Sequence, residues 1–180
     1  AITRSADTNW WEEVTRSNAP ITSHQIAASG ATEKSQYAFT TSYFSQDSPV
    51  RFVGYERVTI RANSSTKVLN DRLTIGENFT LSMDNRKGGF GNNSEQNAVS
   101  AAYKHHPLLP VYDIAGNFAG SRGLNLGNNN APFARLSRNQ DDRSKRIRAF
   151  GSVYAEAKIA DKITAKTTFG FDVVGRRFLD

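Results

Sequence analysis

The sequence predicts an all-β fold, in which about six antiparallel strands form a segment of a transmembrane β-barrel. Three observations support this prediction. Polar and apolar residues alternate in several stretches, these stretches are about ten residues or longer, and short turns alternate with long loops between them. A period of two gives a strand two different faces. A tilted strand of about 9–11 residues is long enough to cross a bilayer.

The first two predicted strands are residues 21–30 and 35–44, joined by a short turn at 31–34. The first strand is the weaker, because only Ile26 and Ala28 mark an apolar face. The second alternates throughout, with one face formed by Tyr37, Phe39, Thr41 and Tyr43 and the other by Gln36, Ala38, Thr40 and Ser42.

The next two predicted strands, 55–63 and 73–83, follow a longer connection at 45–54 and are joined by a short turn at 69–71. In the third strand, one face holds Val58, Ile60 and Ala62, and the other holds Arg57, Thr59, Arg61 and Asn63. In the fourth, the apolar face holds Leu73, Ile75, Phe79, Leu81 and Met83. Glu77 interrupts that face, for which a bulge or a nearby cation is the expected explanation.

The last two predicted strands lie within residues 145–174, after a very long connection at 84–144 that includes a short helical piece near 95–103. The apolar face of the fifth strand holds Ile147, Ala149, Gly151, Val153, Ala155, Ala157 and Ile159. After the turn at 160–162, the sixth strand places Ile163, Ala165, Thr167, Phe169, Phe171 and Val173 on one face. All the short turns therefore fall at one end of the sheet.

Alternation also occurs in soluble β-sandwiches, whose apolar face packs against a second sheet. Strand length favours the barrel, because strands in ordinary sheets have about five or six residues. The two kinds of connection match the short-turn and long-loop ends of outer-membrane barrels, and Tyr37, Tyr43 and Tyr55 lie near strand ends, where a membrane interface holds aromatic residues. Since bacterial barrels need about eight strands or more, we expect the chain to be part of a larger barrel.

Composition excludes several classes of protein. With no cysteine, the chain has neither a disulfide framework nor a thiolate metal site, and no run of about 18 apolar residues forms a transmembrane helix. The net charge of +6 permits nucleic acid as a partner. However, the basic residues from Arg135 to Arg148 are interleaved with Asp141 and Asp142, which favours a loop edge near lipopolysaccharide phosphates, and no nucleic-acid partner is expected.

No catalytic or metal site is predicted. The sequence has no nucleophile elbow and no paired acids of the glycosidase kind. His105 and His106 are adjacent, so they point in different directions, and no third ligand stands at metal-binding spacing. Asp113 with Gly116 and Asn117 is typical of a turn. We therefore expect no enzymatic activity and no cofactor.

The polar face supplies the candidate substrate-facing residues, which are Gln36, Arg57, Arg61, Arg148, Tyr154 and Lys166. Two interpretations stay open. The first is a solvated wall in which Glu156 and Asp172 neutralise the cations, and the second is a wall whose field favours polar or anionic cargo.

Several segments resemble the SusC/RagA-like group of TonB-dependent outer-membrane transporters. Residues 107–117 (PLLPVYDIAGN) are similar to the family's P-x-x-P-V-Y-D-x-x-G-N-Y segment, residues 9–14 to its N-T-D-W-Q-D-E-V segment, and residues 23–30 to its N-H-N-L-S-V-S-G strand. Shorter matches lie at 43–46, 55–57 and 154–156. Each match alone is weak, but together they keep the family's order over nearly the whole chain.

The resemblance implies a barrel of roughly 22 strands, closed by a plug. It implies uptake of oligosaccharides or peptides in the outer membrane of a Gram-negative bacterium, with a SusD-like surface lipoprotein as lid and the TonB complex acting through the plug. The family's plug, TonB box and N-terminal extension are not recognised in this sequence, and the resemblance implies that the chain corresponds to an early part of the barrel, after the plug. Residues 1–20, 45–54 and 84–144 would be extracellular, and 175–180 would begin the next loop.

The long loop at 84–144 is expected to fold compactly and to pack against the rest of the barrel rim or against the lid protein. Its candidate contact residues are Leu108, Leu109, Tyr112, Asp113 and Phe118. Two alternatives to the importer remain at this point, namely a passive porin or adhesin barrel and a soluble carbohydrate-binding β-sandwich.

Overall fold

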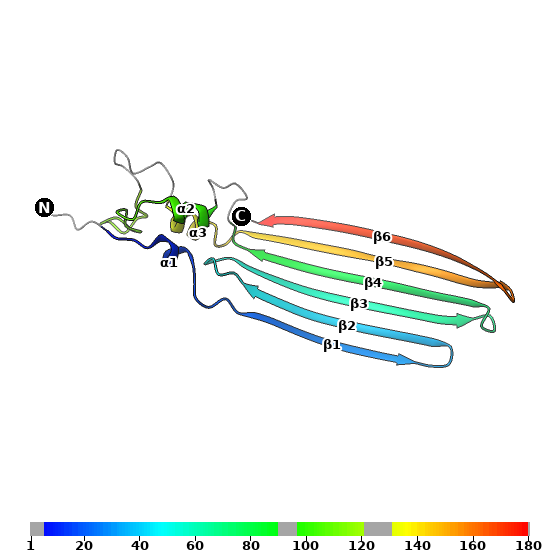
Figure 1. Ribbon diagram of the computed structural model, residues 1–180. Helices are drawn as coiled ribbons and strands as arrows, with labels where there is room; N and C mark the ends of the chain where they lie inside the picture. The colour runs from blue at the N-terminus through cyan, green and yellow to red at the C-terminus, as the bar shows by residue number, and fades with distance from the viewer. Residues whose placement is uncertain (1–5, 90–96, 121–130, 180) are drawn as a thin grey trace.

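The structure is a computed structural model, and it describes residues 6–89, 97–120 and 131–179. Its main element is one antiparallel sheet of six strands that pair in chain order (Figure 1). The strands are β1 (Ile21–Ala31), β2 (Ser35–Asp47), β3 (Gly54–Val68), β4 (Leu73–Lys87), β5 (Arg143–Ala160) and β6 (Ile163–Leu179). The predicted all-β fold is confirmed.

The register aligns the apolar residues of neighbouring strands in rows. Ile60 lies opposite Thr41 on β2 and Leu81 on β4, and Leu81 lies opposite Ala149 on β5. Ala149 in turn faces Val173 on β6. Because directly opposed residues point to the same side of a sheet, these rows form one continuous surface, which we call the apolar face. The opposite surface, with Arg57, Arg61 and Arg148, is the polar face.

The apolar face is long enough to span the hydrocarbon core of a bilayer, which is about 30 Å thick. Its apolar rows begin at Val58 and Met83 and end at Val68 and Leu73, while the next row beyond Val58 is polar and contains Glu56. The stretch 58–68 rises about 33 Å along the strand. Strands of outer-membrane barrels are tilted by about 35–45°, which reduces this rise to about 25 Å, the height of the apolar band of such barrels.

The two ends of the sheet differ. The turns between β1 and β2, β3 and β4, and β5 and β6 lie at one end, and the helices lie at the other (Figure 1). The helices are short: α1 (Trp10–Val14), α2 (Ala98–Lys104) and α3 (Pro132–Arg138). No helix in the described part of the chain is long and apolar enough to cross a membrane.

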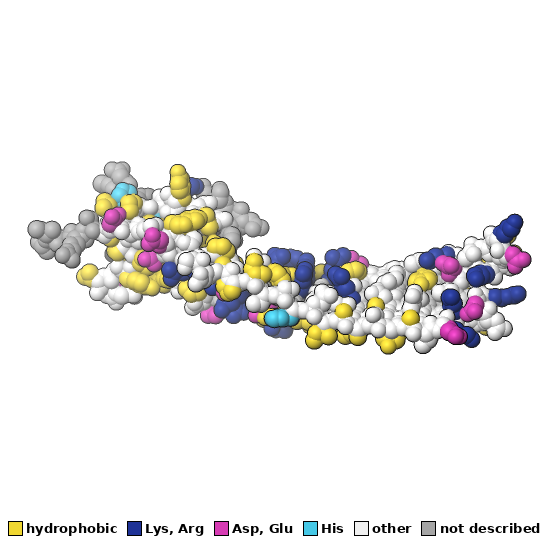
Figure 2. Space-filling model, turned by 60° about the horizontal axis from the view of Figure 1, so that its bottom comes forward, with side chains coloured by type: hydrophobic (Ala, Val, Ile, Leu, Met, Phe, Trp, Pro, Cys, Tyr) yellow, Lys and Arg dark blue, Asp and Glu magenta, His cyan; other side chains and the backbone are white. Residues whose placement is uncertain are grey.

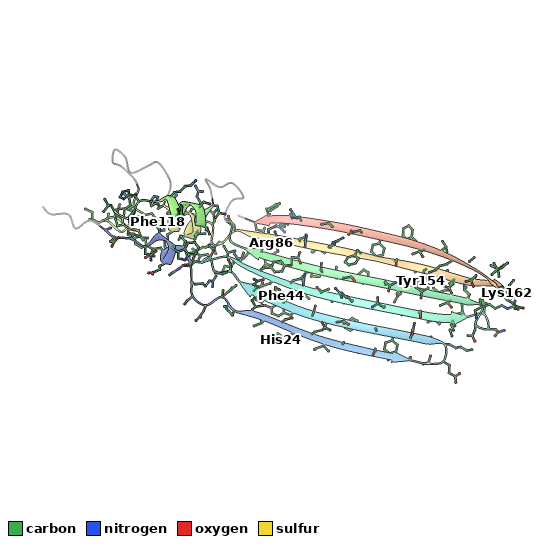
Figure 3. The ribbon with its side chains drawn as sticks, viewed as in Figure 1. His24, Phe44, Arg86, Phe118, Tyr154 and Lys162 are labelled. Carbon is green, nitrogen blue, oxygen red and sulfur yellow. The ribbon has the colours of Figure 1, made fainter. Side chains whose placement is uncertain are left out.

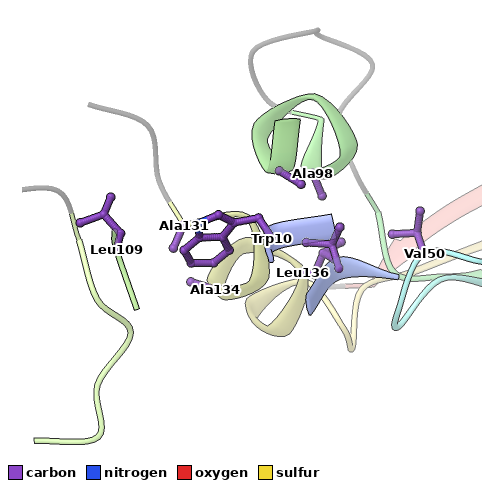
Figure 4. Packing of buried hydrophobic residues seen from close by; sticks show 9 residues of the cluster. Trp10, Val50, Ala98, Leu109, Ala131, Ala134 and Leu136 are labelled. Carbon is purple, nitrogen blue, oxygen red and sulfur yellow. The ribbon is translucent and has the colours of Figure 1, made fainter. Parts of the chain in front are cut away.

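The three helices and residues 105–120 form a small unit, which we call the helical cap. Its centre is the aliphatic side chain of Leu136 and the indole ring of Trp10, which are 1% and 3% exposed (Figure 4). Val14, Val50 and Leu109 complete the buried cluster together with small alanine side chains. Three hydrogen bonds hold α1 and the preceding Thr8 against residues 106–109. The Trp10 indole nitrogen donates to the His106 carbonyl (3.1 Å), and the Thr8 hydroxyl and backbone N–H donate to the Leu109 (2.7 Å) and Pro107 (2.9 Å) carbonyls.

Both faces of the sheet lack a second layer of protein within the described residues. Ile26 and Phe169, both on the apolar face, are each 71% exposed. A soluble sandwich buries these side chains against a second sheet, so the sandwich alternative has no support in this structure.

Several expectations from the sequence need correction. β4 continues to Lys87 and β5 begins at Arg143, so residues 84–87 and 143–144 belong to strands and the connection is shorter than 84–144. β6 likewise extends to Leu179, so most of 175–180 is strand. These added residues are mostly polar. Polar and apolar residues therefore do not alternate there, and the sequence does not reveal these strand ends.

Glu77 follows neither expected explanation. It is in register with Ser64 and accepts a hydrogen bond from the Ser64 hydroxyl (2.9 Å). The register shows no bulge at this position.

Candidate functional site

The polar face contains a depression that lies close to the helical cap, and we call it the arginine depression. It has a volume of about 370 Å³ and is lined by residues of β1 to β5. The lining residues are Ser23, Gln25, Thr40, Ser42, Phe44, Arg57, Thr59, Arg61, Thr80, Ser82, Asp84, Arg146, Arg148 and Phe150. In the space-filling view, Lys and Arg side chains gather on the part of the sheet next to the cap and again at the end with the short turns (Figure 2).

The pairing of the strands explains why these side chains meet. Phe44, Arg57, Asp84 and Arg146 occupy one row across β2 to β5, because each lies directly opposite the next. Thr59 and its neighbours form a second row, and Arg61 belongs to a third. Residues far apart in the sequence thus share one small surface.

Asp84 is the buried centre of this row. Its side chain is only 2% exposed. The Arg146 guanidinium donates to Oδ2 from Nε (2.6 Å) and also from Nη2, and the Tyr55 hydroxyl donates to Oδ1 (3.1 Å). The carboxylate therefore compensates the charge of Arg146 and has little capacity left for other cations.

Arg148 is also paired, but in a more exposed position. Its Nε and Nη2 donate to the two carboxylate oxygens of Asp172 at 2.9 and 2.6 Å. The guanidinium also lies 5.0 Å from the centroid of the Phe150 ring. Two parallel hydrogen bonds fix the plane of a guanidinium, so the orientation of Arg148 is well defined.

Arg57 and Arg61 have no such partner. Among the described residues, no carboxylate oxygen lies within 4.0 Å of either guanidinium. The Arg57 guanidinium lies 5.8 Å from the centroid of the Phe44 ring, and both arginines are exposed on the polar face. The arginine depression therefore presents two uncompensated positive charges.

The other three candidate residues of the polar face, Gln36, Tyr154 and Lys166, lie in the parts of β2, β5 and β6 next to the short turns. Figure 3 shows Tyr154 in this part of the sheet. The Lys166 ammonium lies 4.3 Å from the centroid of the Tyr154 ring and 3.6 Å from Glu156 Oε2. Tyr154 covers Gly76, the residue directly opposite it on β4. Tyr154 and Gln36 line a smaller pocket of about 230 Å³. The structure thus divides the candidates into two groups.

The sequence did not identify Asp84, Arg146, Phe44 and Phe150 as parts of a site. The sequence predicts Asp84 in the long loop, because the expected fourth strand ends at residue 83, whereas the structure continues it to Lys87. Arg146 falls within the expected fifth strand, but its basic neighbours favour the edge of a loop. The position of Asp84 opposite Arg57 follows from the register, which one sequence does not contain. The phenylalanines follow the alternation and point to the polar face, which was a signal that went unused.

Within the helical cap, Leu109 is buried, whereas Leu108 and Tyr112 are each 50% exposed. Tyr112 stacks on Phe118, with ring centroids 5.4 Å apart, and both rings contact Phe133 of α3. Phe118 also packs against the buried cluster of the cap, whereas Leu108 and Tyr112 remain half exposed.

Asp113 forms the turn predicted from the sequence. Its Oδ1 accepts hydrogen bonds from the backbone N–H groups of Asn117 (2.9 Å) and Ala115 (2.8 Å), and Gly116 has a φ of 82°. These hydrogen bonds, led by that from Asn117, lower the pKa of Asp113 below its ordinary value. The role of the Asp113 carboxylate is therefore to stabilise this turn.

His105 and His106 differ in their surroundings. His105 is 6% exposed and packs edge-on against Trp10, with ring centroids 4.6 Å apart. Burial lowers the pKa of His105, and the neighbouring His106 lowers it further. Across the described ranges, no three His, Cys, Asp or Glu side chains are grouped so as to hold a metal ion.

The sequence matches no known family model. It is similar to two curated proteins of Formosa agariphila, TonB-dependent receptor P3, with 30% identity over 92% of this chain, and TonB-dependent receptor P26, with 26% identity over 91%. The chain spans only 17% and 16% of the lengths of these relatives.

Solved structures of the RagAB peptide transporter share the fold. One has a TM-score of 0.73 and 20% identity, and the closed-closed state of the RagAB peptide importer has a TM-score of 0.68 and 18% identity. Each alignment covers 96% of this chain and 19% of the solved chain. The six-stranded sheet therefore has the fold of a segment from a much larger β-barrel.

Proposed function

This chain is a barrel segment of a SusC/RagA-like TonB-dependent outer-membrane transporter, and from this membership we propose that the protein imports a nutrient into a Gram-negative bacterium. The nutrient is an oligosaccharide or a peptide, and the TonB complex supplies the energy through the plug. The segment contributes lipid-facing wall, lumen lining and an outer loop. Its role is binding and passage, so we expect no enzymatic activity.

The observation that carries the proposal is the division of one sheet into two faces. The apolar face has rows of Ile60, Leu81 and Val173 and a height of about 25 Å, so we assign it to lipid. The polar face, with its arginine depression, lines the aqueous interior. No soluble partner is needed to explain why Phe169 is exposed, because acyl chains cover it.

We further propose an orientation. The short turns near Lys34, Asn70 and Asp161 face the periplasm, since outer-membrane barrels have short periplasmic turns and longer extracellular loops. The helical cap then lies outside the cell together with residues 1–20, 45–54 and the long connection after β4.

The helical cap is the proposed contact surface for a SusD-like lipoprotein lid. Leu108 and Tyr112 are half exposed, Tyr112 stacks on Phe118, and Asp113 lies in the adjoining turn. Leu109 is buried, so it supports this surface from beneath and makes no contact with the lid. Such exposed apolar groups are typical of interaction sites.

Gene deletion tests this proposal. We expect a strain without the parent gene to lose growth on at least one polysaccharide or peptide source, and a strain without TonB to lose growth on the same source. Complementation with the wild-type gene restores growth only when TonB is present. Growth that returns without TonB identifies a passive porin and contradicts the proposal, and unimpaired growth of the deletion strain on every source contradicts nutrient import.

A further inference from the structure

We propose that the arginine depression binds acidic groups of the cargo, namely the carboxylates or sulfates of an oligosaccharide or the carboxylates of a peptide. This inference rests on the proposed import function and adds the chemical class of the cargo. The uncompensated guanidinium groups of Arg57 and Arg61 are the primary binding groups.

The charge balance of the depression supports anion binding. Four arginines line it against one aspartate, Asp84, and a second aspartate, Asp172, lies beyond its edge. These two carboxylates are paired with Arg146 and Arg148. A depression with one sign of charge in a low-dielectric wall concentrates the field and attracts ions of the opposite sign.

The positions of the two arginines suit an extended ligand. Arg57 and Arg61 lie on the same face of β3 with Thr59 between them. Their Cα atoms are about 13 Å apart along the strand, from a rise of about 3.3 Å per residue. A chain molecule that carries acidic groups at two points along its length can engage both arginines at once, which increases its apparent affinity.

Neighbouring groups complete the site. Phe44 lies beside Arg57, and Phe150 lies beside Arg148, so aromatic faces restrict two of the guanidinium groups. Ser42 and Ser82 lie on either side of the buried Thr59, in the row that continues to Arg148 and separates Arg57 from Arg61. A guanidinium binds a carboxylate or sulfate through parallel hydrogen bonds, and the serine hydroxyls can donate to the remaining oxygens.

The location of the depression favours cargo over lipid as the source of the acidic group. All its arginines lie on the polar face, on the opposite side of the sheet from the apolar rows. The depression also lies near the helical cap, which is the end where cargo enters in the proposed orientation. A carboxylate of the plug is the remaining alternative, and the experiment below distinguishes it.

The test measures binding to the purified full-length transporter by isothermal titration calorimetry. The acidic probes are oligogalacturonate and a hexa-aspartate peptide, and their neutral counterparts are methyl-esterified oligogalacturonate and a hexa-asparagine peptide. We expect at least one acidic probe to bind about tenfold more tightly than its neutral counterpart, as charge-assisted hydrogen bonds permit. The two pairs of probes distinguish a carbohydrate from a peptide source.

The variant Arg57→Gln/Arg61→Gln should weaken binding of the acidic probe by about tenfold or more. The matched control is Lys67→Gln/Lys158→Gln, which removes the same charge from two exposed residues of the polar face near the short turns. The control should change affinity by less than about twofold.

Three results overturn the proposal: no binding of either acidic probe, equal binding of acidic and neutral probes, or equal effects of the two double variants. If the Arg57/Arg61 variant instead makes the plug more sensitive to trypsin while no probe binds, the depression holds a plug carboxylate and the proposal is wrong. Binding to the purified transporter requires no TonB, so the calorimetry result does not depend on the growth experiment. The growth experiment tests nutrient import, and calorimetry tests anion binding by the arginine depression.

Discussion

At the scale of single residues, Asp84 and Asp172 form similar ion pairs in different surroundings. The Asp84 side chain is 2% exposed, whereas the Asp172 side chain is 48% exposed. We predict that Asp84→Asn lowers the free energy of unfolding by about 1.5–3 kcal/mol, since it removes the charge that satisfies Arg146. Asp172→Asn should cost less than about 1 kcal/mol, because solvent screens an exposed pair.

Urea unfolding of the parent barrel in lipid vesicles measures both free energies. Equal losses in the two variants would show that burial of Asp84 has no energetic consequence. A loss confined to Asp172→Asn would contradict the described arrangement of the arginine depression.

His105 provides a pH-dependent contribution to the stability of the helical cap. Burial lowers its pKa, so the folded cap favours the neutral imidazole and the unfolded chain takes up a proton at higher pH. The contribution is therefore complete above about pH 7.5 and is lost as the pH falls through about 6.5. We predict lower hydrogen-exchange protection of residues 98–109 at pH 5.5 than at pH 7.5.

Two variants control this measurement, with protection factors corrected for the intrinsic pH dependence of exchange. His105→Phe keeps an aromatic ring against Trp10 and should remove the pH dependence of protection. His106→Phe should retain it. A pH dependence that survives in His105→Phe would assign the effect to another group.

At the scale of the elements, close contact between a glycine and an aromatic ring joins β4 to β5. A Cβ atom at Gly76 would collide with the ring of Tyr154 across the strand pair, whereas a Cβ atom at Gly170 would meet only the Gly151 carbonyl at 3.6 Å. We predict that Gly76→Ala lowers the free energy of unfolding by about 1–3 kcal/mol through overpacking. Gly170→Ala should change it by less than about 0.5 kcal/mol.

The same unfolding experiment compares these two variants. If Gly76→Ala proves neutral, the Tyr154 ring moves freely and does not fix the strand pair. A large loss of unfolding free energy in Gly170→Ala would indicate that another side chain lies close to Gly170, which the structure does not show.

The helical cap depends on one small apolar cluster. Leu136 is 1% exposed, and its truncation in Leu136→Ala should cost about 2–5 kcal/mol of local stability. Leu108 is 50% exposed, so Leu108→Ala should cost less than about 1 kcal/mol. Limited proteolysis of the connection between β4 and β5 should become faster in Leu136→Ala alone. Similar proteolysis of both variants would contradict the described packing.

Strands and helices differ in how far the sequence predicts them. Alternation located all six strands, because each has two different environments on its two faces. The ends of β4 and β5 were missed, because residues such as Asp84 and Ser144 belong to the polar ends where the alternation ceases. Helices α1 and α3 have five and seven residues, which is less than two helical turns. Such short helices show no clear periodicity of apolar residues. Tertiary packing around Leu136 stabilises them.

Positions of single side chains were predicted less well than the elements. Its place near a strand end predicts Tyr55 at a membrane interface, but in the structure Tyr55 lies on the polar face and donates a hydrogen bond to Asp84. Glu77 is explained by Ser64, which lies on a different strand. Both outcomes depend on cross-strand register, and register is a property of strand pairs that the separate strands do not reveal.

At the scale of the whole molecule, the sheet has two edges, because β1 and β6 each pair with only one neighbour. Unpaired backbone groups are not tolerated in lipid. The chain covers 19% of the length of the RagAB importer chains that it resembles. In the proposed function, further strands of the parent barrel satisfy both edges and complete the lumen around the arginine depression.

Spin labels on consecutive residues of β3 test the central claim most directly, namely that the apolar face contacts lipid and the polar face lines water. This segment has no native cysteine, so single cysteines can be introduced here into a parent transporter freed of any others. We predict that labels at 58, 60 and 62 are accessible to oxygen dissolved in the lipid, and that labels at 61 and 63 are accessible to a water-soluble nickel complex. Accessibility without this alternation, or with the opposite phase, would contradict the account.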